Sequence, residues 1–351
     1  MGPALVLLNF ALAFVLATGK EIGQANAARN KQLPRPNEVY WSSDVEKKLQ
    51  RLFSEEEGER FRRKATTLSV VSLQKGCGRM KNRLAVLEDG TKVCCRYRDN
   101  KNELRGDLYS YHFNYLLRMW NASPTTIVKV DFSSSQWTSV ANTAVEAGWE
   151  DGSPVVMVLY IDGLEKEYMP SLLKEEDAVL DLESMNNVSA SDQVVLMQWT
   201  DMIVFDFIIG HTDRLFSNLL NLQWNPHMME KCIQNLERSP SGNLLLIDNE
   251  SGFWIGYISA NKKPSNYQLQ VFFLQRICLF RRSTIEAIEW LHSSGQGDII
   301  LEEHIHSTDN ESYSSVRRLN SAERKEFLSR LGVVLERIQD CSAMNTSTNT
   351  M

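Results

Sequence analysis

Two apolar segments constrain the fold of this chain more than any other part of its sequence. The first runs from Gln193 to Ile209, where apolar residues recur three or four positions apart, and Gly210 follows it. This spacing predicts a helix that ends at the glycine. The second is the short run from Leu244 to Ile247, which predicts a buried strand. With 351 residues and 43% hydrophobic residues, we expect one two-lobed unit or two small domains.

Polar residues with a distinctive spacing follow both segments. Asp213 and Arg214 come after the predicted helix, Asn218 lies five positions after the Asp, and Asp248 comes directly after the predicted strand. Protein kinases use this layout, with a loop Asp as the base and the Asn and a later Asp as metal ligands. The leading His-Arg of the kinase signature is absent, and the Arg here follows the Asp. Alternatively, Asp213-Arg214 is a surface ion pair and Asp248-Asn249 is a turn.

The N-terminal half predicts a glycine loop between strands. Gly76 and Gly78 follow the strand-like sequence LSVVSL, and two further strands are predicted at Leu84–Leu87 and Lys92–Tyr97. The sequence 88–91, Glu-Asp-Gly-Thr, predicts a tight turn between them. We therefore expect a β-rich lobe with a glycine loop at one edge.

The second of these strands carries a candidate nucleotide contact. Side chains alternate along a strand, so Cys94 and Arg96 share a face, and in this interpretation Cys94 faces the adenine while Arg96 carries the charge. Arg96 takes the place of the kinase Lys, although a guanidinium is not equivalent to an ammonium. A helix is predicted over Gly106–Met119, and its Asp107 is the candidate partner of Arg96. Alternatively, Asp107 is an ordinary acid at a helix N-terminus.

The remaining elements fit a two-lobed unit. Residues 44–64 predict a leading helix, 155–161 a buried strand that connects the lobes, and 170–190 an insertion or a lobe-linking loop. After these come three predicted helices, at 268–279, 283–291 and 321–338.

The first residues indicate entry into the secretory pathway. Residues 5–18 are apolar apart from one Asn, which fits a signal peptide, and Ala25–Ala27 offers a cleavage site. The alternative is an uncleaved type II signal anchor, but positive charge follows the apolar run rather than preceding it, which weakens that interpretation. Both alternatives stay open.

Sequons and cysteines agree with a luminal location. Four sequons are predicted to carry glycans: Asn121, Asn187, Asn310 and Asn345. A fifth, at Asn249, is expected to stay empty because it adjoins a candidate metal ligand. Six cysteines form an even set that is compatible with disulfides, and the 15 possible pairings stay open.

Charge argues against nucleic acid as a partner. The chain has 38 basic and 44 acidic residues, a net charge of −6, and no long run of Lys or Arg.

Three long strings resemble the Four-jointed family of Golgi-luminal protein kinases. They are GCGRMKNRLAVLEDGTKVCCRY, QWTDMIVFDFIIGHTDRLFSNLLNLQWNPHMM and LLLIDNESGFWIGY, and the likeness extends from about Leu73 to the C-terminal helix. The resemblance implies an α+β, atypical kinase fold with a β-rich N-lobe and a mainly helical C-lobe. The expected organisation is a signal segment (1–27), a stem with leading helix (28–65) and a catalytic domain (66–351) whose N-lobe is 66–161 and C-lobe 162–351.

The resemblance also implies an activity and its residues. It implies transfer of phosphate from ATP, with Mn²⁺ or Mg²⁺, to Ser or Thr in extracellular domains of Fat- and Dachsous-like cadherins in the Golgi, which tunes planar cell polarity and growth. Asp213 would be the base, Asn218 and Asp248 the metal ligands and Arg96 the phosphate contact. Gly76, Gly78, Cys94 and Asp107 would complete the ATP site.

Two departures from the family pattern keep an alternative open. Asp107 stands where a longer Glu is expected, and His211 stands where Asn is expected. The alternative is a secreted or Golgi pseudokinase that acts as a binding protein. Separation of Asp213 from Asp248, or a bridge from Cys77 that closes the glycine loop over the cleft, would favour it.

Overall fold

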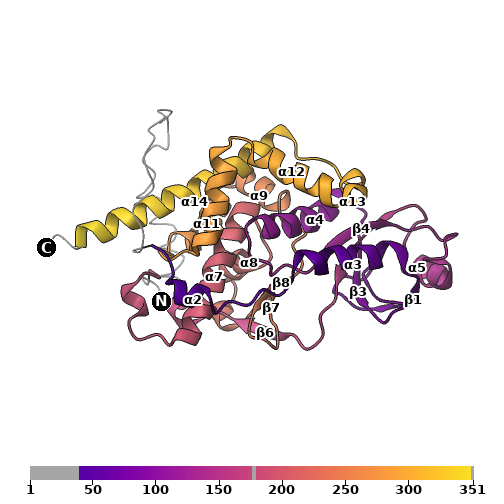
Figure 1. The fold of residues 1–351 in the computed structure, drawn as a ribbon, viewed down its shortest axis with the longest axis horizontal. Coiled ribbons are helices and arrows are strands. Elements are labelled where there is room, and N and C mark those ends of the chain that lie inside the picture. The colour runs from indigo at the N-terminus through magenta and orange to yellow at the C-terminus, as the bar shows by residue number, and fades with distance from the viewer. Residues whose placement is uncertain (1–38, 176–178, 349–351) are drawn as a thin grey trace.

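The computed structural model describes residues 39–175 and 179–348, which form two lobes lying end to end (Figure 1). The predicted signal segment 1–27 and the start of the stem lie outside the described residues. In the part of the chain that the structure describes, no helix is both long and apolar enough to cross a membrane.

The N-lobe is built on an antiparallel sheet with the strand order β1-β2-β3-β5-β4. The strands are β1 (Val70–Lys75), β2 (Arg83–Leu87), β3 (Lys92–Tyr97), β4 (Thr125–Lys129) and β5 (Pro154–Leu159). The predicted hairpin is confirmed, with Leu84 opposite Cys94, and Gly90 takes the positive φ of +84° that its tight turn requires. The sequence analysis missed β4.

The two faces of this sheet pack against different neighbours, as the predicted alternation along β3 requires. Cys95 lies in an outer core with Trp137, whereas Cys94 lies in the core that the sheet shares with helix α4 (Lys101–Leu116) and the C-lobe. Phe61 of helix α3 (Glu55–Thr67) packs into the outer core. This helix is therefore part of the folded N-lobe and does not stand apart from it. A short helix, α5 (Ala141–Glu146), completes the lobe.

Serine caps divide the leading segment, which the sequence analysis predicted as one helix over 44–64. The structure has two helices there, α2 (Ser43–Glu46) and α3. The side chain of Ser42 caps the first helix, and Ser54 and Glu57 form a capping box at the start of the second. The prediction was wrong because the second cap starts a new helix at residue 55.

Helix α4 begins five residues earlier than predicted. The side chain of Asn100 accepts a hydrogen bond from the backbone N–H of Asn102, so the helix starts at Lys101 and Asp107 lies in its second turn. Asp107 is thus not the acid of the helix N-terminus, which removes the alternative explanation for it.

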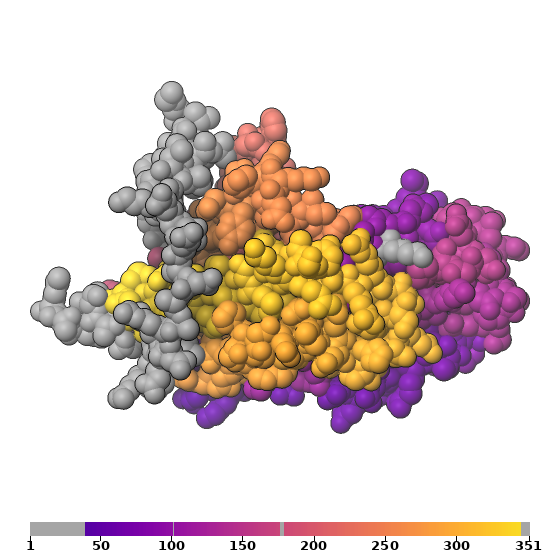
Figure 2. All heavy atoms as spheres, turned by 90° about the horizontal axis from the view of Figure 1, so that it is seen from above, coloured from indigo at the N-terminus to yellow at the C-terminus, as the bar shows by residue number. Residues whose placement is uncertain are grey.

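The C-lobe is mainly helical and surrounds α7 (Ala190–Ile209). Helix α7 is buried on all sides from Leu196 onward and ends at Gly210, as predicted, with a φ of +68°. Figure 2 shows the orange and yellow C-terminal part of the chain covering one face of this lobe. The other helices are α6 (Ser171–Lys174), α8 (Leu215–Asn221), α9 (Ile255–Lys262), α10 (Pro264–Leu274), α11 (Arg282–Ser293), α12 (Gly297–Thr308), α13 (Asn310–Ser315) and α14 (Ser321–Thr348).

A small second sheet lies in the C-lobe beneath the junction of the lobes. Its order is β6-β7-β8, with β6 (Glu165–Tyr168), β7 (Cys232–Arg238) and β8 (Leu244–Leu246). Strand β8 is fully buried, as its apolar sequence predicts, and it leads directly to Asp248. The fold thus delivers α4, the end of α7 and the end of β8 to one place.

Candidate active site

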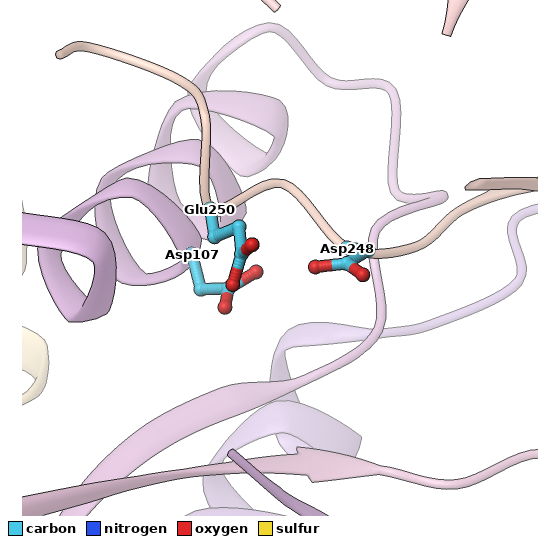
Figure 3. A group of neighbouring side chains, drawn as sticks. All are labelled: Asp107, Asp248 and Glu250. Atoms are coloured by element: carbon cyan, nitrogen blue, oxygen red, sulfur yellow. The ribbon is translucent and has the colours of Figure 1, made fainter. Parts of the chain in front are cut away.

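Three carboxylates from two distant segments meet between the lobes (Figure 3). Asp107 comes from α4, and Asp248 and Glu250 come from the segment after β8. One oxygen of each lies within 4.8 Å of the others. Asp107 and Glu250 are buried, whereas 30% of the Asp248 side chain is exposed. Oxygen ligands at this spacing suit a hard divalent cation.

Arg96 of β3 holds two of these carboxylates. Its Nη1 donates to Asp107 Oδ1 at 2.9 Å and to Asp248 Oδ1 at 2.8 Å. Asp107 Oδ1 also accepts the backbone N–H of Asn249 at 2.9 Å, so the shorter acid does reach its partner. Although burial lowers the pKa of Arg96, the carboxylates of Asp107 and Asp248 raise it above its ordinary value. The guanidinium therefore stays charged beside the candidate metal ligands.

Glu250 is a site residue that the sequence analysis quoted but gave no role. Arg98 Nε donates to Glu250 Oε2 at 2.6 Å, and Arg79 forms an ion pair with Oε1. Burial and the carboxylates of Asp248 and Asp107 raise the pKa of Glu250 to about 7, although Arg98 opposes the shift. The backbone at Asp248 has a φ of +54° and is not extended, so the alternation of side chains along a strand does not place Glu250 beside Asp248.

His211 connects the loop after α7 to the segment after β8. The backbone N–H of Asp213 donates to His211 Nδ1 at 3.2 Å, so Nε2 carries the proton and donates to the backbone carbonyl of Asp248 at 3.1 Å. The ring is 3% exposed, and burial, followed by the charge of Arg214, lowers its pKa well below the usual value. A neutral imidazole therefore fixes Asp213 relative to Asp248, although the sequence analysis expected Asn here.

Asp213 lies in the loop after α7 and is partly exposed. Burial and the nearby carboxylate of Asp248 raise its pKa. Thr212 Oγ1 donates to Asp213 Oδ1 at 3.4 Å, a long hydrogen bond that leaves the carboxylate weakly engaged. A partly desolvated and weakly engaged carboxylate is suited to accept a proton from a hydroxyl group.

Arg214 is not the exposed ion pair that the alternative interpretation required. It is fully buried, pairs with Asp206 of α7, and donates to the carbonyls of Asn235 at 2.9 Å and Ile247 at 3.1 Å. The loop is therefore anchored to β7 and to the end of β8, which holds Asp213 in place.

Asn218 of α8 offers a buried oxygen. Its Nδ2 donates to the carbonyl of Met228 at 3.1 Å, whereas its Oδ1 has no hydrogen-bond donor among the described residues. Such an acceptor is costly to bury without a partner. The three carboxylates fit a divalent cation, whereas the orphaned oxygen of Asn218 has no contact with them among the described residues, and its role as a metal ligand stays a prediction.

A disulfide anchors the glycine loop to the sheet. Cys77 and Cys94 are bonded, and Asn82 Nδ2 donates to the carbonyl of Cys77 at 2.6 Å. Cys94 is therefore half of a disulfide, and its place beside the adenine stays a prediction. At Gly78 a Cβ would meet no atom within 4 Å, so the tip is open. A bridge at Cys77 is a feature that the binding-protein alternative requires. That alternative also expects Asp213 and Asp248 to lie apart, whereas His211 links their backbones.

The other cysteines and the sequons also take definite positions. Cys278 and Cys341 form a second disulfide, and Cys95 and Cys232 are free. The Asn121 side chain is buried, and its Oδ1 accepts a hydrogen bond from Asn114 Nδ2 at 2.8 Å. This burial argues against the glycan predicted at Asn121, since a glycan needs an exposed amide.

The remaining sequons separate by exposure. Asn187 and Asn310 are exposed. Asn249 is buried, which agrees with the expectation that it carries no glycan. The side chain of Asn345 lies outside the described part of the structure.

Comparison with known proteins identifies relatives over most of the chain. Residues 56–344 match the family model described as the Four-jointed box protein middle domain. Four-jointed box protein 1 of Xiphophorus maculatus is 36% identical over 261 residues, which are 74% of this chain and 60% of that protein. The extracellular serine/threonine protein kinase four-jointed of Drosophila melanogaster is 29% identical over 355 residues, covering 87% of this chain and 60% of that protein. The chain thus spans about three fifths of the length of these relatives.

A solved structure shares the fold. The Golgi casein kinase with Mn/ADP bound superposes with a TM-score of 0.52 at 10% identity, over 82% of this chain and 77% of that one. At this identity the likeness concerns the fold alone. It confirms the predicted α+β, kinase-like architecture.

Proposed function

This chain belongs to the Four-jointed box protein family, and on that premise we propose that it is a secretory-pathway protein kinase. The reaction is transfer of the γ-phosphoryl group of ATP to a Ser or Thr hydroxyl. The observation that carries the proposal is the link through His211, which joins the backbone of Asp213 to that of Asp248. A base and a metal ligand held at one site are what phosphoryl transfer requires.

Each site residue has a role in this reaction. The substrate hydroxyl oxygen forms a bond to the γ-phosphorus while the bond to the β-phosphate oxygen breaks and ADP leaves. The hydroxyl proton passes to the Asp213 carboxylate. Arg96, held by Asp107, presents a fixed positive charge to the phosphates. His211 keeps the base oriented throughout.

A divalent cation, Mn²⁺ or Mg²⁺, completes the proposed site. Asp248 and the orphaned oxygen of Asn218 would hold it, with Glu250 beside them. When bound, such an ion neutralises the charge of the phosphates. The acidic cluster would repel ATP without it.

The resemblance to the family supports a proposal for the substrate and the cellular role. We propose that the acceptors are Ser or Thr residues in extracellular domains of Fat- and Dachsous-like cadherins, modified in the Golgi lumen. Such marking would tune cadherin binding and thereby planar cell polarity and growth. The relative from Drosophila melanogaster, named an extracellular serine/threonine kinase, supports the location and the reaction. The anchor and the cleaved signal peptide both remain compatible with it.

The test is phosphate transfer by the full chain secreted from cultured cells. Radiolabelled ATP, Mn²⁺ and a purified pair of cadherin repeats are supplied, and label in the repeats is measured. Asp248→Ala should abolish transfer. The matched control is Asp99→Ala, since Asp99 is exposed and pairs with Lys81 outside the site. Transfer by Asp248→Ala at the rate of the control would contradict the proposed site.

A pseudokinase is the second candidate, and the disulfide at Cys77 is the observation that favours it. Its signature would be no transfer to any acceptor and no shift in melting temperature with ATP and Mn²⁺. Transfer that depends on Asp248 excludes it.

A further inference from the structure

Arg79 extends from the tip of the glycine loop to two other segments. Its Nη1 donates to Glu103 of α4 at 2.8 Å, and its Nη2 contacts Glu250 Oε1. The side chain is 55% exposed, although it touches a carboxylate that is itself 2% exposed. One guanidinium therefore joins the loop between β1 and β2 to α4 and to the segment after β8.

The base of this loop is held by a disulfide, whereas its tip is held by hydrogen bonds and ion pairs. The disulfide from Cys77 to Cys94 and the hydrogen bond from Asn82 to the Cys77 carbonyl hold the base. Arg98 Nη1 donates in turn to Asn82 Oδ1 at 2.5 Å. Beyond Gly78, with its φ of +85° and open surroundings, Arg83 Nη1 donates to the carbonyl of Met80 at 2.7 Å, and the contacts of Arg79 hold the tip against the carboxylates.

The two oxygens of Glu250 are held by different arginines. Arg98, which is buried, takes Oε2, and Arg79 takes Oε1. If the buried guanidinium of Arg98 left, the buried carboxylate of Glu250 would lose its compensating charge. The half-exposed guanidinium of Arg79 can return to water at little cost. Oε1 is therefore the oxygen that a cation can reach.

The charges at the site favour such an exchange. Among the groups in direct contact, four carboxylates in their ionised form, those of Glu103, Asp107, Asp248 and Glu250, face three guanidinium groups, those of Arg79, Arg96 and Arg98. This arrangement leaves one net negative charge. When a divalent cation replaces Arg79, four carboxylates face two guanidinium groups and two cationic charges, and none is left over.

We propose that Arg79 is a counter-ion carried by the glycine loop, which competes with the divalent cation for Glu250. Binding of the cation displaces the guanidinium from Oε1 and releases the loop tip. The proposal rests on the proposed function in that it expects a divalent cation beside Asp248, but its test measures the cation itself.

The experiment measures Mn²⁺ binding to the full chain without nucleotide, by the electron paramagnetic resonance signal of free Mn²⁺. Arg79→Met removes the competing charge, and we expect it to bind Mn²⁺ about tenfold more tightly than the unmodified chain, as for loss of one partly screened ion pair. Arg79→Lys keeps the charge and should bind as the unmodified chain does. Lys81→Met is the matched control, because Lys81 is an exposed cation two positions further on that pairs with Asp99.

A second measurement reports on the loop. Hydrogen exchange at the amide of Asn82, which donates to the carbonyl of Arg79 at 2.9 Å, should accelerate when Mn²⁺ is added to the unmodified chain, and should already be fast in Arg79→Met. Melting temperatures verify that each variant is folded. If Arg79→Met does not fold, Arg79→Lys takes its place in the exchange measurement, because Mn²⁺ should release its loop as well.

Several outcomes would overturn the inference. Equal or weaker Mn²⁺ binding by Arg79→Met would show that Arg79 does not compete. An equal gain in Lys81→Met would show a general effect of charge. Absence of Mn²⁺ binding in every variant would also overturn it, while phosphate transfer, measured separately, would still decide the proposed function.

Discussion

Replacement of Gly106 by Ala should separate the two segments that build the site. Gly106 lies in α4 next to Asp107, and a Cβ there would lie 2.2 Å from the backbone oxygen of Glu250 and 2.7 Å from its carbonyl carbon. Ordinary contact begins at 3.4 Å, so the helix or the Glu250 segment must move by about 1.2 Å. Because both contacts are backbone atoms, no rotamer change relieves the clash. The movement would stretch the hydrogen bonds that the Asp107 carboxylate accepts from Arg96 and from the backbone N–H of Asn249.

The expected magnitudes follow from two opposed effects. Alanine in a helix interior gains about 1 kcal/mol over glycine, whereas overpacking costs roughly 1–3 kcal/mol. We therefore expect a free energy of unfolding lowered by up to about 2 kcal/mol, measured by urea denaturation. Phosphate transfer should fall by about 100-fold, since a displacement of about 1 Å at a positioned group has that effect.

A second helical glycine supplies the control. At Gly332 of α14 a Cβ would approach the side chain of His292 at 3.1 Å, and a side chain can shift by a few tenths of an ångström. Gly332→Ala should therefore keep its activity and gain up to about 1 kcal/mol of stability. If Gly106→Ala behaves as Gly332→Ala does in both assays, the reasoning about the close approach of α4 is refuted.

Three further outcomes are expected. Thr212→Val removes a hydrogen bond that lowers the pKa of Asp213, so less of the base is ionised at acidic pH. The acid limb of the pH–rate profile should therefore move to higher pH, and an unmoved limb would exclude Asp213 as the base. Replacing Cys278 and Cys341 by Ser opens a bridge between residues 63 apart and should lower the free energy of unfolding by up to about 4 kcal/mol in urea denaturation, whereas an unchanged midpoint would contradict this. Asn121→Gln should leave the mass lost on glycosidase treatment unchanged, unlike the same change at the exposed sequons, Asn187 and Asn310.

Local features of the site could be predicted because neighbours in sequence encode them. The end of α7 at Gly210 and the hairpin before β3 follow from glycines that accept a positive φ. The placement of Asp213 in a loop and of Asp248 after a strand follows from apolar runs that end just before them. Helix starts were less accurate, because the side chain of a single Asn or Ser sets them.

The sequence by itself thus determined the end of α7, the hairpin before β3, the segments that carry the candidate base and the candidate metal ligands, and the pairing of Arg96 with Asp107 eleven positions away. Tertiary structure alone decided the place of Glu250, the choice of disulfides and the contacts of Arg98. Arg98 and Glu250 are separated by 152 positions, so their contact depends on how the lobes pack and on the absence of a side chain at Gly106. No local pattern encodes such a contact, because it arises only when two independently formed segments are brought to within a hydrogen bond of each other.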